Sequence, residues 1–171
     1  GKSTLGRTII HLQEATDGQG FLDGEDITHV RGSDLKRVRE KMQIVFQDPY
    51  SSINPRMTIE DTIREALLLS RRFPRYQISA ETKKLVDLVG INMRMLRAYP
   101  RELSGGEQRR IGLLRALAIN PKFLILDEVT AGLDLLSTEA VLNLLQNYQE
   151  AHACSYLLIT HDLGAASRGH A

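Results

Sequence analysis

The feature that most constrains the fold is a short run of apolar residues, Phe123–Leu126, followed at once by Asp127 and Glu128. Such a continuous run is typical of a parallel strand that is covered on both faces. A second run of this kind, Tyr156–Ile159, comes after a helical pattern over 138–152. Strands that alternate with helices predict an α/β fold with a mostly parallel sheet.

The N-terminal part of the chain contains shorter elements. Residues 3–13 predict a helix, and Asp23-Gly24 predicts a hairpin turn after a strand at 20–22. A charged helix capped by Ser33 leads to a buried strand at 43–46.

From residue 48 to residue 103 the pattern becomes entirely helical. Three helical pieces are expected there, at 58–72, 80–89 and 92–97. We therefore expect a core formed by residues 1–47 and 104–171, with 48–103 inserted as a helical subdomain.

Composition limits the class of protein. The 171 residues can bury one sizeable core, and a formal charge of +1 gives no argument for nucleic acid or a membrane surface. No stretch approaches the roughly 20 apolar residues that span a bilayer. The single cysteine, Cys154, excludes an internal disulfide, fits a reducing compartment and is expected to be a small buried apolar residue.

The first four residues, Gly1-Lys2-Ser3-Thr4, match the end of the phosphate-binding motif G-x-x-x-x-G-K-S/T. In the complete motif, backbone N–H groups and a helix N-terminus bind the phosphates, the lysine reaches the β- and γ-phosphates, and the hydroxyl binds Mg²⁺. The upstream half would precede Gly1, so we expect the sequence to be a fragment. Taken alone, these residues are explained equally well as an exposed polar N-terminus.

Asp127 and Glu128 directly follow the predicted strand at 123–126. Ligands of open α/β sheets bind at the carboxyl ends of the strands. One carboxylate there can hold Mg²⁺, and its neighbour can take a proton from an attacking water. The alternative is a surface turn with two solvated acids, and the buried strand before the pair makes this alternative weaker.

The most specific pattern is Leu103–Arg110, in which Ser104 precedes two glycines and a predicted helix at 107–118. A capping serine and two glycines at a helix start expose free N–H groups at the positive end of the helix dipole. This arrangement suits an anion, although nothing in the sequence places it on the chain's own phosphates. A flexible linker before a helix would also explain the glycines.

Together these patterns resemble the ATPase of ABC transporters, and the resemblance covers nearly the whole chain in the family's order. Leu103–Glu107 resembles the family's signature motif, whose last position is more often Gln. The other matching elements are the end of Walker A (Gly1–Thr4), the Q-loop (Gln47), Walker B (Leu124–Glu128), the D-loop (Ala131–Asp134) and the switch histidine (His161). The resemblance implies a P-loop NTPase of RecA-like fold that uses ATP and Mg²⁺.

The resemblance also implies a role for each matching residue. The phosphate-binding residues would be Gly1, Lys2, Ser3 and Thr4. The Mg²⁺ site would be formed by Ser3, Gln47 and Asp127. The catalytic residues would be Glu128 as general base, His161 at the γ-phosphate and Gln47 as its sensor. Residues that clamp the ATP of a second subunit, or signal to it, would be Ser104, Gly105, Gly106 and Asp134.

The sequence departs from the family pattern in three places. Val129 replaces the Pro usual after the catalytic Glu, Ala131-Gly132 replaces the common Ser-Ala of the D-loop, and Glu107 replaces Gln. The D-loop changes could alter coupling between subunits, although no catalytic side chain is lost. The nucleotide-stacking aromatic residue and the first strands would lie upstream of Gly1. A fragment without them is expected to be weak or inactive alone.

Residues 45–58 resemble the Q-loop region of ATPases from dipeptide and oligopeptide importers, and residues 23–28 are also similar to that group. The resemblance implies peptide uptake by a protein held peripherally at the cytoplasmic face of the cell's inner membrane. It implies as partners a second ABC ATPase subunit, identical or paralogous, membrane permease subunits that contact 48–103, and indirectly a solute-binding protein. No nucleic acid is expected.

Two other functions stay open on the sequence. A soluble ABC ATPase acting on the ribosome or DNA also uses Leu-Ser-Gly-Gly-Glu, although the single short cassette and residues 45–58 count against it. A nucleotide-binding scaffold without turnover would require loss of Glu128 or His161, and both are present.

Overall fold

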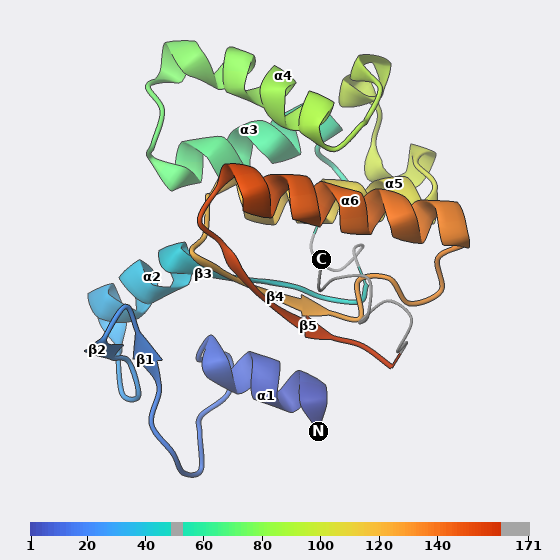
Figure 1. Ribbon diagram of the computed structural model, residues 1–171. Coiled ribbons are helices and arrows are strands. Elements are labelled where there is room, and N and C mark those ends of the chain that lie inside the picture. The colour runs from blue at the N-terminus through green and yellow to red at the C-terminus, as the bar shows by residue number, and fades with distance from the viewer. Residues whose placement is uncertain (49–52, 162–171) are drawn as a thin grey trace.

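The computed structural model describes residues 1–48 and 53–161, and its main sheet has three parallel strands in the order β3-β4-β5 (Figure 1). These strands are β3 (Met42–Val45), β4 (Phe123–Asp127) and β5 (Ser155–Ile159). In the central strand β4, Leu124 pairs with Gln43 on one side and with Tyr156 on the other. The parallel sheet confirms the predicted α/β class.

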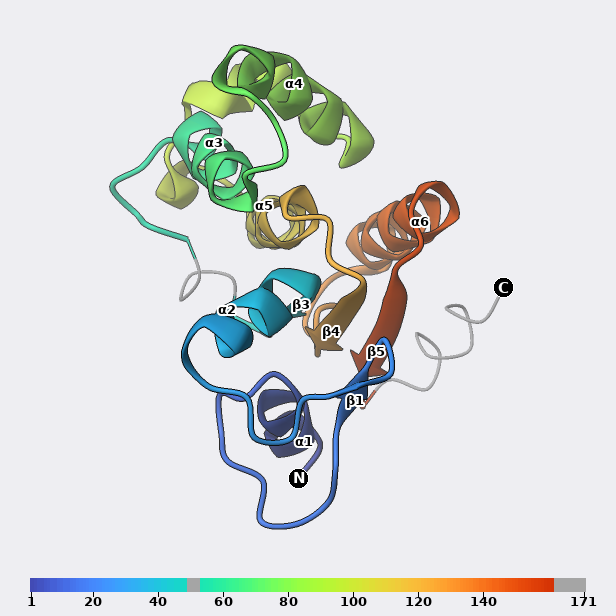
Figure 2. The same cartoon turned by 90° about the vertical axis from the view of Figure 1, so that its left-hand side faces the viewer.

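Helices cover both faces of this sheet. α1 (Lys2–Ile9) lies on one face, and α5 (Gly105–Ala118) and α6 (Leu135–Ala151) lie on the other (Figures 1 and 2). Side chains of β4 alternate between the two layers, because Leu124 and Leu126 join the larger buried cluster and Ile125 joins the smaller. Because both faces are covered, apolar side chains are needed at successive positions of β4, and its sequence is a continuous apolar run.

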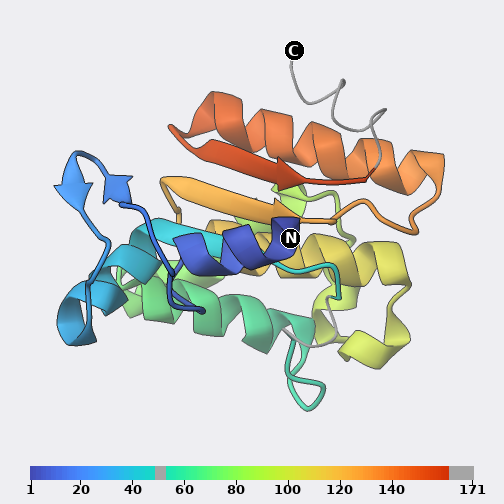
Figure 3. The same ribbon diagram turned by 90° about the horizontal axis from the view of Figure 1, so that it is seen from below.

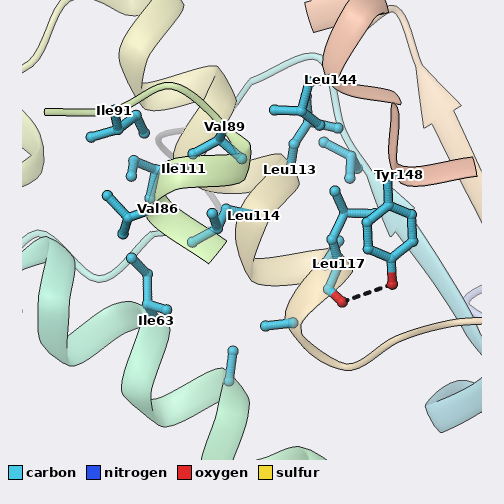
Figure 4. Close-up of a cluster of buried hydrophobic side chains, with 14 of the residues drawn as sticks. Ile63, Val86, Val89, Ile91, Ile111, Leu113, Leu114, Leu117, Leu144 and Tyr148 are labelled. Carbon is cyan, nitrogen blue, oxygen red and sulfur yellow. Dashed lines mark hydrogen bonds between the residues drawn. The ribbon is translucent and has the colours of Figure 1, made fainter. Parts of the chain in front are cut away.

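Between β3 and α5, every regular element in the described residues is a helix. These helices are α3 (Ile59–Ser70), η2 (Arg75–Gln77), α4 (Ile78–Leu88), η3 (Met93–Arg97) and η4 (Pro100–Glu102). α3 packs on α4 and on α5. Figure 4 shows that Ile63 of α3, Val86 of α4 and Ile111 of α5 belong to one buried cluster. The helical segment therefore shares its apolar core with α5.

The N-terminal elements differ in detail from the prediction. The predicted hairpin is confirmed: β1 (Phe21–Leu22) pairs antiparallel with β2 (Glu25–Asp26), and both Asp23 and Gly24 have positive φ, as a tight I′-type turn requires. The predicted helix 3–13 is too long, because α1 ends at Ile9 and His11 has φ +56°.

The cap predicted for the next helix is wrong. α2 (Gly32–Lys41) has Arg31 at its N-cap position and no side-chain capping bond, so Ser33 lies inside the first turn. Among residues 1–48 and 53–161, no helix is both long and apolar enough to cross a membrane.

Candidate functional site

The carboxyl ends of β4 and β5 and the start of α1 meet at one edge of the sheet (Figure 3). Gly6 allows α1 to lie close to the strands. A Cβ at Gly6 would stand 3.1 Å from Ile159 Cδ1 and 3.2 Å from Ile125 Cγ2, which is tighter than ordinary packing. The first residues of the chain are thereby held beside the residues that follow both strands.

Ser3 and Asp127 form the first contact at this edge. Ser3 Oγ donates a hydrogen bond of 3.0 Å to Asp127 Oδ1, and the Asp127 residue is buried, with 5% of its surface exposed. Two oxygens that bind one Mg²⁺ at right angles also lie about 3 Å apart, because each Mg–O distance is about 2.1 Å. The chemistry and spacing of this pair fit adjacent ligands of Mg²⁺.

Lys2, His161 and Glu128 form the second contact. Lys2 Nζ lies 3.1 Å from His161 Nδ1 and donates to the Thr160 carbonyl at 3.3 Å. His161 Nε2 lies 2.8 Å from Glu128 Oε1. An ammonium group can only donate, so Nδ1 accepts and the ring proton sits on Nε2, pointing at Glu128. His161 therefore lies between the Lys2 ammonium group and the Glu128 carboxylate and contacts both.

The backbone at Glu128 is also held in a specific conformation. Its φ of +54° lies in the left-handed region, which a residue other than glycine seldom occupies. The Glu128 N–H donates to the Ile159 carbonyl at 2.8 Å, so the turn after β4 is attached to the end of β5. The Glu128 side chain is 17% exposed, whereas that of His161 is 74% exposed. Backbone strain of this kind is commonly found at functional sites.

Ser104 and its neighbours belong to the helical layer on the other face of the sheet. Ser104 caps α5, which is on the sheet face opposite α1 (Figure 2). Its N–H and hydroxyl donate to Glu107 Oε2 at 2.8 and 2.7 Å. The hydroxyl bond is the main cause that lowers the pKa of Glu107 below its ordinary value. The structure thus builds a complete capping box at the start of α5.

Asp134 belongs to this second region. It caps α6, accepting from Ser137 N at 2.8 Å and from Ser137 Oγ at 2.9 Å, and these bonds lower its pKa. A Cβ at Gly106 would stand 3.1 Å from the same Ser137 Oγ. Gly106 and Asp134 are therefore both close to Ser137. The structure thus brings Gly106 and Asp134 together at Ser137, on the other side of the sheet from the group around Lys2.

Gln47 is exposed, and its carbonyl accepts a hydrogen bond of 3.0 Å from Arg109. Residues 49–52 of the importer-like segment 45–58 lie outside the described residues. Sequence reasoning placed Arg109 in the motif at 103–110 but gave its side chain no role. It lies in the polar run Gln108-Arg109-Arg110, and the sequence pattern does not indicate which of the two arginines is buried.

Comparison with known proteins identifies the class. The model of the family described as "ABC transporter" matches residues 1–131. The chain therefore belongs to the ABC transporter family. Its fold agrees with the dimeric ATP-binding cassette MJ0796 solved in a post-hydrolysis state with ADP and Pi: the TM-score is 0.87 at 27% identity, over 99% of this chain and 73% of that one.

The particular relatives are ATP-binding proteins of peptide transport. The oligopeptide transport ATP-binding protein OppF of Bacillus subtilis (strain 168) is 44% identical, over 95% of this chain and 54% of its own length. The dipeptide transport ATP-binding protein DppF of Lactococcus lactis subsp. cremoris (strain MG1363) is 39% identical, over 95% and 53%. The chain spans about half the length of the curated relatives it matches.

Proposed function

We propose that this chain is the ATP-hydrolysing cassette of an ABC importer that takes up peptides. The observation that carries the proposal is the group at the carboxyl edge of the sheet, where Lys2 and Ser3 lie in hydrogen-bonding contact with His161 and Asp127. The names of the relatives, which are oligopeptide and dipeptide transport proteins, support the peptide as cargo.

ATP phosphates would be held at the start of α1. Lys2 Nζ supplies a cation there, and the N–H groups of the first helical turn, from Gly1 to Thr4, supply donors at the positive end of the helix dipole. Ser3 and Asp127 would hold Mg²⁺, joined by Gln47, which would sense the γ-phosphate. When bound, Mg²⁺ offsets the negative charge that spreads over the phosphate oxygens.

Glu128 would act as the general base. Its carboxylate is oriented by the 2.8 Å contact with His161 Nε2, and its backbone is fixed by the bond to Ile159. A carboxylate held in this way can accept a proton from a water that lies in line with the γ-phosphate. His161 would contact the γ-phosphate with the same ring that orients the base.

The group around Ser137 would serve a second cassette. Ser104 caps a helix on the face opposite α1, and the N–H groups of Gly105 and Gly106 in its first turn would bind the nucleotide of a partner subunit, identical or paralogous. Asp134 would signal across that interface. The solved structure of MJ0796 is described as dimeric, which supports such a pairing.

The division of the chain follows from these roles. Residues 1–47 and 104–171 would form the ATPase core, and residues 48–103 would contact a membrane permease subunit, with a solute-binding protein acting indirectly. The protein would therefore sit peripherally at the cytoplasmic face of the membrane. The relatives named above are peptide transport proteins, which favours an importer over the alternative of a soluble ABC ATPase on the ribosome or DNA.

Purification of the natural protein from its own membranes tests the transport function. We expect it to co-purify with multi-spanning membrane subunits, and we expect its ATPase activity to rise when a peptide-loaded binding protein is added. The same binding protein without peptide is the control. If the protein is recovered only in ribosomal or DNA-bound fractions, the proposed transport role is wrong, although the proposed ATP hydrolysis is unaffected.

Substitution of the base tests the chemistry. Glu128→Gln keeps the shape of the side chain but removes the proton acceptor, so ATP should still bind while turnover falls roughly 10²- to 10⁴-fold. Lys2→Ala should instead weaken ATP binding itself, because the phosphates lose a charged donor. Near-normal turnover in Glu128→Gln would show that another group takes the proton.

A further inference from the structure

Arg109 is a charged side chain buried between the loops that carry the catalytic residues. It lies in the second turn of α5, and the whole residue is 9% exposed. Its Nη1 donates to the carbonyls of Val129 and Ala131, both at 2.8 Å, and its Nη2 donates to the Gln47 carbonyl at 3.0 Å. One guanidinium group thus joins three main-chain positions.

These three carbonyls belong to two functional segments. Gln47 follows β3, whereas Val129 and Ala131 follow β4, one and three residues after Glu128. The Ala131 N–H also donates to the Glu128 carbonyl at 3.0 Å, so the turn that carries the base closes on itself. Arg109 therefore holds the turn that follows Glu128 through the carbonyls of Val129 and Ala131. Its Nη2 holds the backbone of Gln47, the predicted γ-phosphate sensor.

The buried charge is held by these carbonyl dipoles. Burial lowers the pKa of the Arg109 guanidinium, while the charge of Asp48 opposes that shift. Among the residues that the structure describes, Nε is buried without a hydrogen-bond partner. A buried charge contributes little to stability by itself, whereas the three hydrogen bonds of Arg109 fix the relative positions of the carbonyls that they join. A rigid planar fork can fix several carbonyls at once, which a lysine cannot do.

We propose that Arg109 is a positioning residue that couples the signature helix α5 to Glu128 and Gln47. The inference rests on the proposed function, because it assigns Arg109 to the same hydrolytic site. Ser104, the cap of α5, lies five residues before Arg109 on this helix, or about 7.5 Å along the axis. A movement of α5 when Ser104 meets a partner's nucleotide therefore reaches the base and the sensor through one side chain.

Kinetics of the natural protein with substitutions at Arg109 test this coupling. Arg109→Met removes every donor but keeps much of the length, and Arg109→Lys keeps the charge without the fork. We expect kcat to fall about 10- to 100-fold in Arg109→Met, with KM for ATP changed less than about threefold, as for a displaced catalytic group. Arg109→Lys should lie between it and the unmodified protein.

A matched control is Arg37→Met on α2, which removes an exposed arginine paired with Glu25 and should leave kcat unchanged. Hydrogen exchange gives a readout that does not depend on catalysis. In Arg109→Met, amides over residues 128–133 should exchange faster relative to those of residues 141–148 in α6. A merely structural role would raise exchange in both segments together.

The outcomes separate this inference from the proposed function. If the unmodified protein hydrolyses ATP and folded Arg109→Met matches its kcat, the positioning role is wrong and the proposed function stands. If the unmodified protein does not hydrolyse ATP, the proposed function fails, and the exchange ratio alone decides the role of Arg109. If Arg109→Met does not fold, Arg109→Lys carries the same comparison.

Discussion

Among single residues, Gly6 sets the distance between α1 and the sheet. A side chain there would meet Ile159 and Ile125 at 3.1 and 3.2 Å. We expect Gly6→Val to destabilise the natural protein by about 1–3 kcal/mol, the usual cost of overpacking a core. Urea unfolding measures this difference.

The control for this substitution is Gly105→Val, because a Cβ at Gly105 meets no atom within 4 Å. Its free energy of unfolding should stay within about 0.5 kcal/mol of the unmodified protein. Equal effects at the two glycines would mean that helix propensity, rather than the close approach of α1, explains the loss.

Motif residues could be predicted from the sequence because each occupies a fixed place beside a strand or helix end. Lys2, Asp127 and Glu128 were found in this way, and the structure brings all three to one edge of the sheet. Arg109 could not be found, because its role depends on burial and on carbonyls that are 20 to 62 residues away in sequence. Every residue has a backbone carbonyl group, so the sequence does not indicate which carbonyls accept a hydrogen bond from a side chain.

At the scale of elements, apolar runs predicted the strands closely, whereas helix ends were less certain. β4 was expected at 123–126 and extends to Asp127. Burial on both faces leaves little choice of register for such a strand. α2 shows the opposite case, since Ser33 favours a cap by propensity but the backbone enters the helix from Arg31. The capping preference of Ser33 therefore did not decide where α2 begins, and helix ends are commonly misplaced by one or two residues.

The capping box of α5 should make stability depend on pH. Hydrogen bonds from Ser104 lower the pKa of Glu107 in the folded protein. A carboxyl group with a lowered folded pKa stabilises the fold above its unfolded pKa of about 4.3, and this stabilisation is lost as pH falls through the folded pKa. We expect the gap in unfolding free energy between the unmodified protein and Glu107→Gln to shrink as pH falls from 6 to about 3.

A double substitution isolates this effect. In a Ser104→Ala background the main cause of the lowered Glu107 pKa is absent, so Glu107→Gln should change the pH profile much less. Urea titrations at several pH values measure all four proteins. An unchanged effect of Glu107→Gln in that background would mean that Ser104 does not set the charge state of Glu107.

At the scale of the whole molecule, the helical segment and the sheet layer share one apolar core. Figure 4 shows side chains of α3, α4, α5 and α6 in a single cluster, and the strand residues Leu124 and Leu126 belong to it too. The division at residues 48–103 is a proposal about function. Packing indicates instead that the helical segment and the sheet layer unfold together, because α5 contacts both α3 and β3.

A substitution at the centre of this cluster should therefore unfold the whole chain together. Ile63 of α3 has no exposed surface, and Ile63→Ala should cost about 2–5 kcal/mol, the range for a cavity left by a large aliphatic side chain. Leu69→Ala on the same helix is the control, since Leu69 is 62% exposed. With a shared core, native-state hydrogen exchange should show that Ile63→Ala lowers protection in β4 as much as in α3. Protection lost in α3 and α4 but retained in β4 would instead make the helical segment a separate folding unit, able to move against the catalytic edge without loosening it.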